Sequence, residues 1–308
     1  MAEDRKHKGE ILAVGGGKGG VGKSFILSSL GMSLARKGKV VMIDGDLGGA
    51  NLHNFLGVSP PKTSLIDFFE RKVPLSELIV DSGIENLSLI SGMVGTTGGE
   101  NIKYVQKKKL FSHILSLEAD YILIDLGAGA HFNTIDTLLL ADRKIIVVTP
   151  EILSIENMYN FLRNLFFRRL GSALGQHGYR ELVISVWNDR RGLGIKNFQQ
   201  LVAHLKNISP ELRGLVDCEL RGFKIHIVLN QAKGHRDIMI GNSVKSVCRK
   251  FFGIDALYSG YVEYDESVSH SVNRRLPYMS AFADSRCARS INKLADNLVS
   301  GQQVRIVS

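Results

Sequence analysis

A glycine-rich run, GGGKGGVGKS, occupies residues 15–24 and ends in Lys23 and Ser24. Its last eight residues fit the phosphate-loop pattern, in which a glycine, four further residues and a second glycine precede lysine and serine. Lys23 would reach the β and γ phosphates of a nucleotide, and the Ser24 hydroxyl would bind Mg²⁺. A glycine-rich turn of an ordinary Rossmann unit is the alternative interpretation. Glycines let backbone N–H groups turn toward phosphate oxygens, and we expect this of Gly17, Gly19, Gly20, Val21 and Gly22.

Acidic residues directly follow two other apolar runs of the chain. Asp44 and Asp46 follow the first run, and Asp125 follows the second. One of the first pair could anchor the water shell of Mg²⁺ while the other orients an attacking water. Asp125 suits a direct role on Mg²⁺, and Gly127 would offer a backbone N–H to the γ-phosphate. The alternative for both places is a solvated strand end followed by a turn.

Apolar, β-branched runs alternate with helical patterns along most of the chain. This alternation predicts a doubly wound α/β fold with a mostly parallel sheet, whose ligands lie at the carboxyl ends of the strands. Residues 171–224 break the rhythm, with a strand expected at 182–187 and a helix at 195–206. We therefore interpret the chain as one domain, 1–308, with an insertion. Elsewhere we expect strands at 11–14, 39–44, 87–90, 121–125, 144–148, 224–230 and 256–262, and helices at 25–36, 102–117, 133–140, 152–170 and 284–299.

The composition limits the class of protein. No apolar run approaches the ~20 residues of a membrane span, and the polar N-terminal tail, residues 1–8, is unlike a signal peptide. Cys218, Cys248 and Cys287 lie far apart, which argues against a disulfide framework or a metal site. We therefore expect a cytoplasmic protein. The net charge of +9 permits contact with nucleic acid or anionic lipid and demonstrates neither.

Several motifs together resemble one family. KGGVGKS at residues 18–24 is similar to the deviant Walker A motif of the MinD/ParA ATPases, which has an extra lysine near the loop start. DGDLGGANLHNFLG at 44–57 resembles the first switch of that family, and DLGAG at 125–129 resembles its second switch. The spacing is closest to the flagellar-placement branch, FlhG or FleN. Asn230 matches an asparagine that contacts adenine, and Asn188, at the end of the strand expected in the insertion, is a second candidate.

The resemblance implies a SIMIBI-type P-loop NTPase that uses ATP and Mg²⁺ and hydrolyses ATP to ADP and phosphate as an ATP-dependent homodimer. Lys18 would cross to the ATP of the partner subunit and neutralise charge during γ-phosphoryl transfer. Asp46 would hold the attacking water. Ser24, Asp46 and Asp125 would serve Mg²⁺ directly or through water. Phe25 stands where many relatives have a hydroxyl at the α-phosphate, so only its backbone N–H is expected to bind there.

The implied function is a nucleotide-switched ATPase that positions or regulates cellular machinery, in flagellar placement or a related task, with an unidentified protein partner. A ParA-like protein that binds nonspecific DNA is one alternative, although the chain shows no evident DNA-reading appendage. A nucleotide-binding scaffold with little turnover is another. Both alternatives keep the ATP site: the first changes what the site controls, and the second lowers its turnover.

Two surface features remain open. The last helix and tail, residues 284–308, carry an apolar stripe of Ile291, Leu294, Leu298 and Val299 beside basic residues. Such a stripe either packs on the domain or grips the inner face of the membrane peripherally. Basic residues on two further expected helices, at 107–109 and 163–169, are interpreted as a solvated face.

Overall fold

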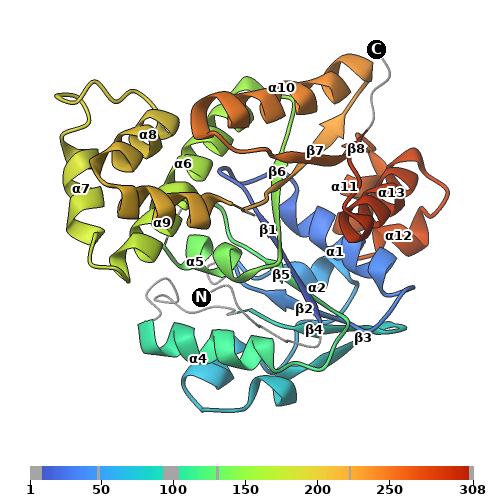
Figure 1. Ribbon diagram of the computed structural model, residues 1–308. Coiled ribbons are helices and arrows are strands. Elements are labelled where there is room, and N and C mark those ends of the chain that lie inside the picture. Colours follow the sequence, from blue (N-terminus) through green and yellow to red (C-terminus); the bar gives the residue numbers. More distant parts are fainter. Residues whose placement is uncertain (1–8, 47–48, 93–103, 130–131, 222, 305–308) are drawn as a thin grey trace.

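The fold is built on one eight-stranded sheet with the strand order β3-β4-β2-β5-β1-β6-β7-β8 (Figure 1). The computed structural model describes residues 9–46, 49–92, 104–129, 132–221 and 223–304. All paired strands are parallel except β3, which runs antiparallel to β4. This confirms the predicted α/β fold and adds β3, an edge strand without a long apolar run. The strands are β1 (Glu10–Gly15), β2 (Val40–Asp44), β3 (Val80–Ile84), β4 (Leu87–Ile90), β5 (Tyr121–Asp125), β6 (Arg143–Val148), β7 (His226–Ala232) and β8 (Leu257–Glu263).

Helices cover both faces of the sheet, and alternate strand residues enter two separate cores. In β1, Ile11 and Ala13 face one core, whereas Leu12 and Val14 face the other. Burial on both faces explains why the central strands are continuous apolar runs. The first core is covered by α3 (Leu65–Phe69), α4 (Tyr104–Leu115), α5 (Phe132–Leu140), α6 (Ile152–Gly175) and α10 (His235–Phe252). The second is covered by α1 (Lys23–Leu34), α2 (Leu52–Phe55), α12 (Tyr278–Ala281) and α13 (Arg286–Ser300), with α11 (Ser267–Asn273) beside α12.

Residues 182–187, predicted as a strand, are helical instead, because they belong to α7 (Arg180–Asn188). Val183 and Val186 are buried, and their spacing of three residues matches a helical face rather than a strand. The β-branched composition misled the local prediction, since tertiary packing overrides intrinsic propensity. Asn188 therefore ends a helix, which removes the strand-end premise for its adenine role. The rest of the region is also helical, with α8 (Phe198–Ile208) and α9 (Pro210–Leu220).

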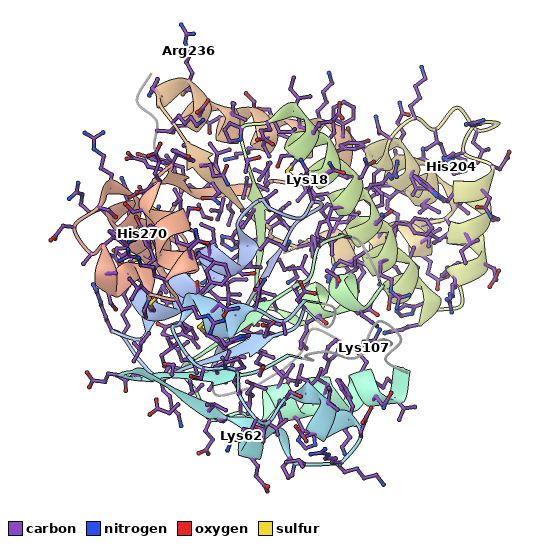
Figure 2. The ribbon with its side chains drawn as sticks, turned by 180° about the vertical axis from the view of Figure 1, so that it is seen from behind. Lys18, Lys62, Lys107, His204, Arg236 and His270 are labelled. Carbon is purple, nitrogen blue, oxygen red and sulfur yellow. The ribbon has the colours of Figure 1, made fainter. Side chains whose placement is uncertain are left out.

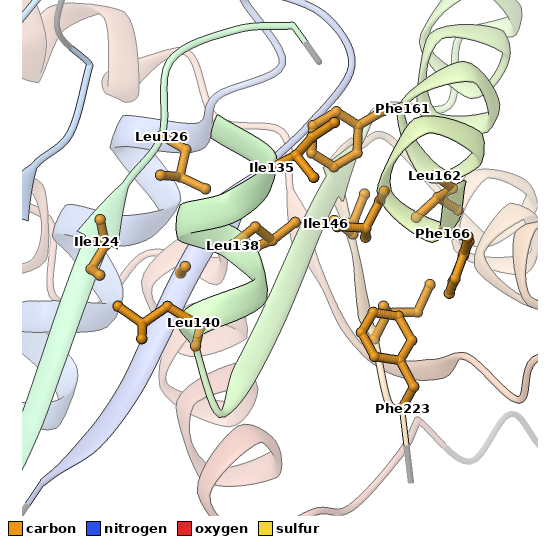
Figure 3. Close-up of a cluster of buried hydrophobic side chains, with 14 of the residues drawn as sticks. Ile124, Leu126, Ile135, Leu138, Leu140, Ile146, Phe161, Leu162, Phe166 and Phe223 are labelled. Carbon is orange, nitrogen blue, oxygen red and sulfur yellow. The ribbon is translucent and has the colours of Figure 1, made fainter. Parts of the chain in front are cut away.

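An aromatic cluster packs this helical region against α6 and α10. Figure 3 shows Phe166 and Phe223, whose ring centroids lie 5.1 Å apart. The Phe166 ring also lies 5.2 Å from the ring of Phe252. Phe198 of α8 lies 5.6 Å from Phe166. Aromatic pairs at such distances contribute about 0.5–1.5 kcal/mol each beyond the area that they bury. The helices of residues 171–224 thus share a core with α6 and α10.

The apolar stripe of α13 packs on the domain. Ile291, Leu294 and Leu298 are fully buried against the core that α1 also covers. In this conformation the stripe is not available to a membrane surface. Among the residues that the structure describes, no helix is long and apolar enough to cross a membrane.

Buried His226 predicts a specific dependence of stability on pH. Its Nδ1 lies 2.7 Å from the Ser259 hydroxyl, and burial followed by the nearby cations Arg143, Lys144 and Lys224 lowers its pKa from 6.5 to about 4. As the pH falls, His226 therefore binds its proton in the unfolded chain before it does so in the folded chain. The full free energy of unfolding is present above pH 6.5, and part of it is lost as the pH falls from 6.5 toward 4.

We expect the free energy of unfolding of the wild type to fall by about 2–3 kcal/mol more than that of His226→Gln between pH 7 and pH 4. Urea unfolding at several pH values measures the difference. His177→Gln, which changes an exposed histidine, should follow the wild type. Parallel pH profiles for the wild type and His226→Gln would contradict the assignment.

Candidate functional site

The glycine-rich loop leaves β1 and ends at the start of α1. Gly20 and Gly22 have φ values of 81° and 91°, in the left-handed region that glycine tolerates. No side chain caps the first turn of α1, so its N–H groups and the positive end of the helix dipole stay available to an anion. A Cβ at Gly17 would lie 2.1 Å from the Asn157 carbonyl oxygen, so α6 packs directly on the loop. This is the geometry of a phosphate cradle.

Asn230 lies against the loop. Its side-chain Nδ2 donates a 2.8 Å hydrogen bond to the Val21 carbonyl, and the residue is buried in the C-terminal half of β7. A Cβ at Gly22 would come within 2.2 Å of that same Nδ2 atom. Strand β7 therefore contacts the loop through Asn230, at Gly22, where a side chain would collide with the asparagine. The sequence resemblance identified Asn230 as a site residue but gave no sign of this bracing contact.

Lys23 is buried beneath the loop. Its Nζ lies 3.5 Å from the Lys18 carbonyl oxygen, and only 8% of the residue is exposed. Burial lowers the pKa of Lys23, whereas the neighbouring carboxylates of Asp125 and Asp46 act in the opposite direction. The Lys23 ammonium lies near the carboxylates of Asp125 and Asp46 and beside the N–H groups of the loop. This arrangement suits the binding of a polyanion together with a cation.

Asp125 and Ser24 meet below the loop. The Ser24 hydroxyl bonds to the Asp125 carboxylate, and burial raises the pKa of Asp125 to about 7. Asp125 Oδ1 is buried and has no hydrogen-bond partner among the described residues. An unsatisfied buried carboxylate oxygen beside a hydroxyl is the donor set that a hard divalent cation prefers. The two residues therefore fit the Mg²⁺ site expected from the sequence.

Asp44, one of the two acids that the sequence offers for Mg²⁺ or an attacking water, is bonded to the backbone. Its two oxygens accept backbone N–H groups, from Leu52 at 2.9 Å and from Asp46 at 3.2 Å, and burial raises its pKa to about 6. The carboxylate is thus occupied in holding the loop between β2 and α2. Of the pair Asp44 and Asp46, the first organises the loop and the second stays near the phosphate cradle. Residues 47 and 48 of the predicted first switch lie outside the described residues.

Asp46 and Gly127 are neighbours across the two strand ends. A Cβ on Gly127 would lie 2.9 Å from Asp46 Oδ1, and the Gly45 N–H donates a 2.8 Å hydrogen bond to the Asp125 carbonyl. The sheet register, which pairs Asp44 with Asp125, brings these segments together. The two predicted switches therefore touch at their first residues.

Lys18 and Phe25 differ in their exposure to solvent. Lys18 is exposed and is labelled in Figure 2. Phe25 is buried, and its ring packs edge-on against Tyr278 at 5.2 Å between centroids. The Tyr278 hydroxyl in turn donates a 2.7 Å hydrogen bond to Asp265. The aromatic ring of Phe25 thus fixes the loop after β8 beside α1, while its backbone stays at the first turn of the helix.

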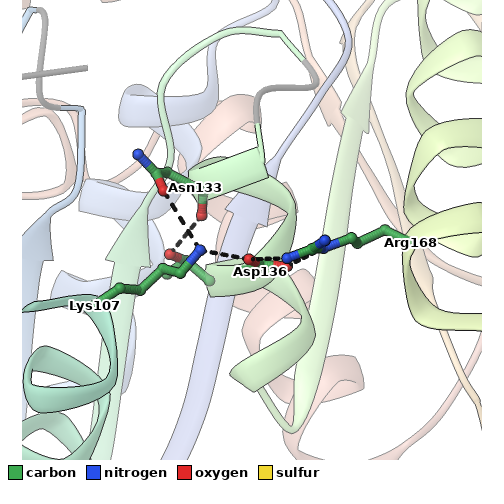
Figure 4. A network of polar contacts seen from close by, with 5 residues as sticks. Lys107, Asn133, Asp136 and Arg168 are labelled. Carbon is green, nitrogen blue, oxygen red and sulfur yellow. Dashed lines mark hydrogen bonds and ion pairs between the residues drawn. The ribbon is translucent and has the colours of Figure 1, made fainter. Parts of the chain in front are cut away.

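A polar network ties α5, which follows the second predicted switch, to its neighbours. Asp136 accepts hydrogen bonds from Arg168 at 2.7 and 2.8 Å and pairs with Lys107 (Figure 4). The cationic partners hold the pKa of Asp136 below its usual value despite its burial. The sequence suggested a solvated face for Lys107 and Arg168. Both side chains are instead paired with Asp136. They connect α4 and α6 to α5.

Comparisons with known proteins agree with this geometry. Residues 9–169 match the family described as "AAA domain". The septum site-determining protein MinD of Helicobacter pylori is 32% identical over 178 residues, which cover 57% of this chain and 66% of the relative. The antiactivator FleN of Pseudomonas aeruginosa is 26% identical over 296 residues, covering 95% of this chain and 87% of that protein. The chain thus spans slightly less than two thirds of the MinD relative and most of FleN.

Solved structures share the fold over nearly the whole chain. The septum site-determining protein MinD of Pyrococcus horikoshii, solved in complex with Mg-ADP, has a TM-score of 0.62. The two chains are 21% identical, and the alignment covers 96% of this chain and 99% of the other. At that identity the likeness establishes the architecture.

Proposed function

Because this chain belongs to the AAA-domain family and is a MinD/ParA-type P-loop ATPase close to FlhG and FleN, we propose that it is a Mg²⁺-dependent ATP-hydrolysing switch. ATP closes two copies into a dimer, and hydrolysis separates them. The switch positions or regulates cellular machinery, as the names of the site-determining relatives imply. The observation that carries the proposal is the orphaned Asp125 Oδ1 beside Ser24, directly beneath an uncapped glycine-rich loop.

Ser24 and Asp125 would hold Mg²⁺, with Asp46 contributing directly or through water. When bound, Mg²⁺ supplies positive charge to the β and γ phosphates. Lys23, held beneath the loop, adds a second cation to the same phosphates. The N–H groups of the loop and of Gly127 bind phosphate oxygens. Asn230 keeps the loop in its cradle shape and is our candidate for contact with adenine.

Transfer of the γ-phosphoryl group requires an oriented water and compensation of the charge that develops. Asp46 is our candidate to accept a hydrogen bond from that water, and its position beside Gly127 supports this role. Lys18 is exposed on the loop and is our candidate for the cation that reaches the ATP of the second copy. Such groups act by position and charge rather than by forming a covalent intermediate.

The test of the proposal is the oligomeric state in each nucleotide. We expect both wild type and Asp46→Ala to be monomeric with ADP·Mg²⁺. With ATP·Mg²⁺, Asp46→Ala should remain a dimer because it cannot hydrolyse the bound ATP. Light scattering after size exclusion measures this. Lys23→Ala, which loses the phosphate-binding cation, is the matched variant that should stay monomeric throughout. Monomers in every nucleotide state would refute the switch.

Asp44 provides a further prediction about turnover. Asp44→Asn keeps the shape of the side chain but presents an NH₂ group to one of the two backbone N–H donors, Asp46 or Leu52. The loop that carries Asp46 should then be misplaced, and we expect turnover to fall by about 100-fold with little change in ATP affinity. Steady-state hydrolysis and nucleotide titration separate the two effects. Asp255→Asn, an exposed aspartate remote from the site, should behave as wild type.

A further inference from the structure

A pocket lies between the edge strand β8 and α13. Its volume is about 330 Å³, which falls within the range of small-ligand sites. The floor is formed by Gly260, Leu294 and Asn297, all buried. The C-terminal segment closes one side, where the Val304 N–H donates a 2.9 Å hydrogen bond to the Tyr258 carbonyl.

Gly260 lies where β8 and α13 pack closely. A Cβ at that position would lie 2.7 Å from Leu294 Cδ1, so a larger residue there would displace the Leu294 side chain. The helix is held there by Asn297, whose Nδ2 donates a 2.8 Å hydrogen bond to the Ser259 carbonyl. This contact joins the floor of the pocket to β8 through a buried side chain.

The rim of the pocket is strongly basic. Arg286, Arg289 and Lys293 repeat along one face of α13 and line the pocket from the helix side. None of the three forms an ion pair with a described residue, although Arg289 Nη1 donates to the Asp284 carbonyl. Glu263, at the end of β8, is the single carboxylate among the lining residues. The lining thus carries three cations and one anion, and the apolar floor of the concavity concentrates their field.

We propose that this pocket binds a phosphate monoester. A phosphate ester carries about −1.5 to −2 charges at neutral pH, which matches the excess positive charge of the lining. Guanidinium groups bind its oxygens through paired N–H donors, and the Lys293 ammonium adds a third cationic contact. Tyr261 on the β8 side offers an aromatic wall for the organic part of the ligand. The site is separate from the glycine-rich loop and does not depend on the proposed ATPase activity.

The test uses full-length protein saturated with ADP·Mg²⁺, so that the glycine-rich loop is already filled. Soluble sn-glycerol 3-phosphate is titrated by calorimetry. Vesicles of phosphatidylcholine, with and without phosphatidic acid, whose headgroup is a phosphate monoester, are offered separately in flotation. The test variant is Arg289→Gln/Lys293→Gln. The matched control, Arg191→Gln/Lys196→Gln, removes the same charge from two exposed residues outside the pocket lining.

We expect saturable binding that weakens at least about ten-fold in the test variant and stays unchanged in the control, since each cation contributes a charge-assisted hydrogen bond. Glu263→Gln should tighten binding by about two- to three-fold, because it removes the one repulsive charge. Binding of the soluble ester assigns the site to a free phosphate compound, and binding of anionic vesicles alone assigns it to a lipid headgroup. No binding of either probe, or equal binding by wild type and the test variant, would overturn the proposal.

Discussion

Replacement of Lys18 by alanine is expected to lower ATP turnover by about 10³-fold while nucleotide affinity stays within a few-fold of wild type. Lys18 is exposed and contributes only its backbone carbonyl to the buried Lys23, so its loss should not disturb the loop of its own subunit. Its charge would be missing from the site of the second copy. Single-turnover hydrolysis and a nucleotide titration measure the two quantities. Lys62→Ala, another exposed lysine, serves as the control.

Mixing two inactive variants tests whether Lys18 acts across the dimer. Lys18→Ala retains Asp46, and Asp46→Ala retains Lys18, so a mixed dimer contains one site with both groups if Lys18 crosses. We expect the mixture to recover about a quarter of wild-type turnover, because half of the dimers are mixed and each has one competent site. If Lys18 serves its own subunit, the mixture stays inactive, which would contradict the two-chain site.

Replacement of Gly22 by alanine is expected to weaken ATP binding by about 100-fold. The new Cβ would lie 2.2 Å from Asn230 Nδ2, so the Asn230 bond to the Val21 carbonyl must break or the loop must shift. The positive φ of 91° adds about 1–2 kcal/mol of backbone strain. Nucleotide titration measures the loss, and thermal unfolding shows that the variant is folded.

Gly20→Ala is the matched control for this clash. Gly20 also has a positive φ, of 81°, but a Cβ there would meet no atom within 4 Å. It carries the backbone strain without the collision with Asn230, so we expect a loss in affinity of no more than about ten-fold. Equal losses for the two variants would show that strain alone, and not the brace from β7, shapes the loop.

The parts of the site that are continuous in sequence could be predicted from the sequence. The glycine-rich loop, Lys23 and Ser24 lie within one short run, and the pattern of glycines reflects a local need for positive φ and close backbone approach. Asp125 was identifiable because an acid that ends a buried apolar run must lie at a strand end. The central strands were equally readable, since burial on both faces requires apolar side chains at every position.

Contacts between distant segments were not predictable in this way. Asp44 was indistinguishable from Asp46 as a possible water or metal ligand until the fold showed its oxygens bonded to the Leu52 and Asp46 amides. Residues 182–187 have the composition of a strand, yet they form a helix because Val183 and Val186 face a core supplied by other helices. Lys107 and Arg168 lie 61 positions apart and are joined through Asp136.

The sequence by itself determined the chemistry of this protein, because phosphate binding depends on backbone freedom and charge within a few consecutive residues. The tertiary structure alone decided which of the two acids, Asp44 or Asp46, is bonded to the Leu52 and Asp46 amides, which strand contacts the loop, and which face of α13 is buried. It also created the basic pocket beside β8, because the lining residues of β8 and α13 are far apart in the sequence and meet only where the helix packs on the strand at Gly260. These features depend on distances between segments that only packing brings into contact.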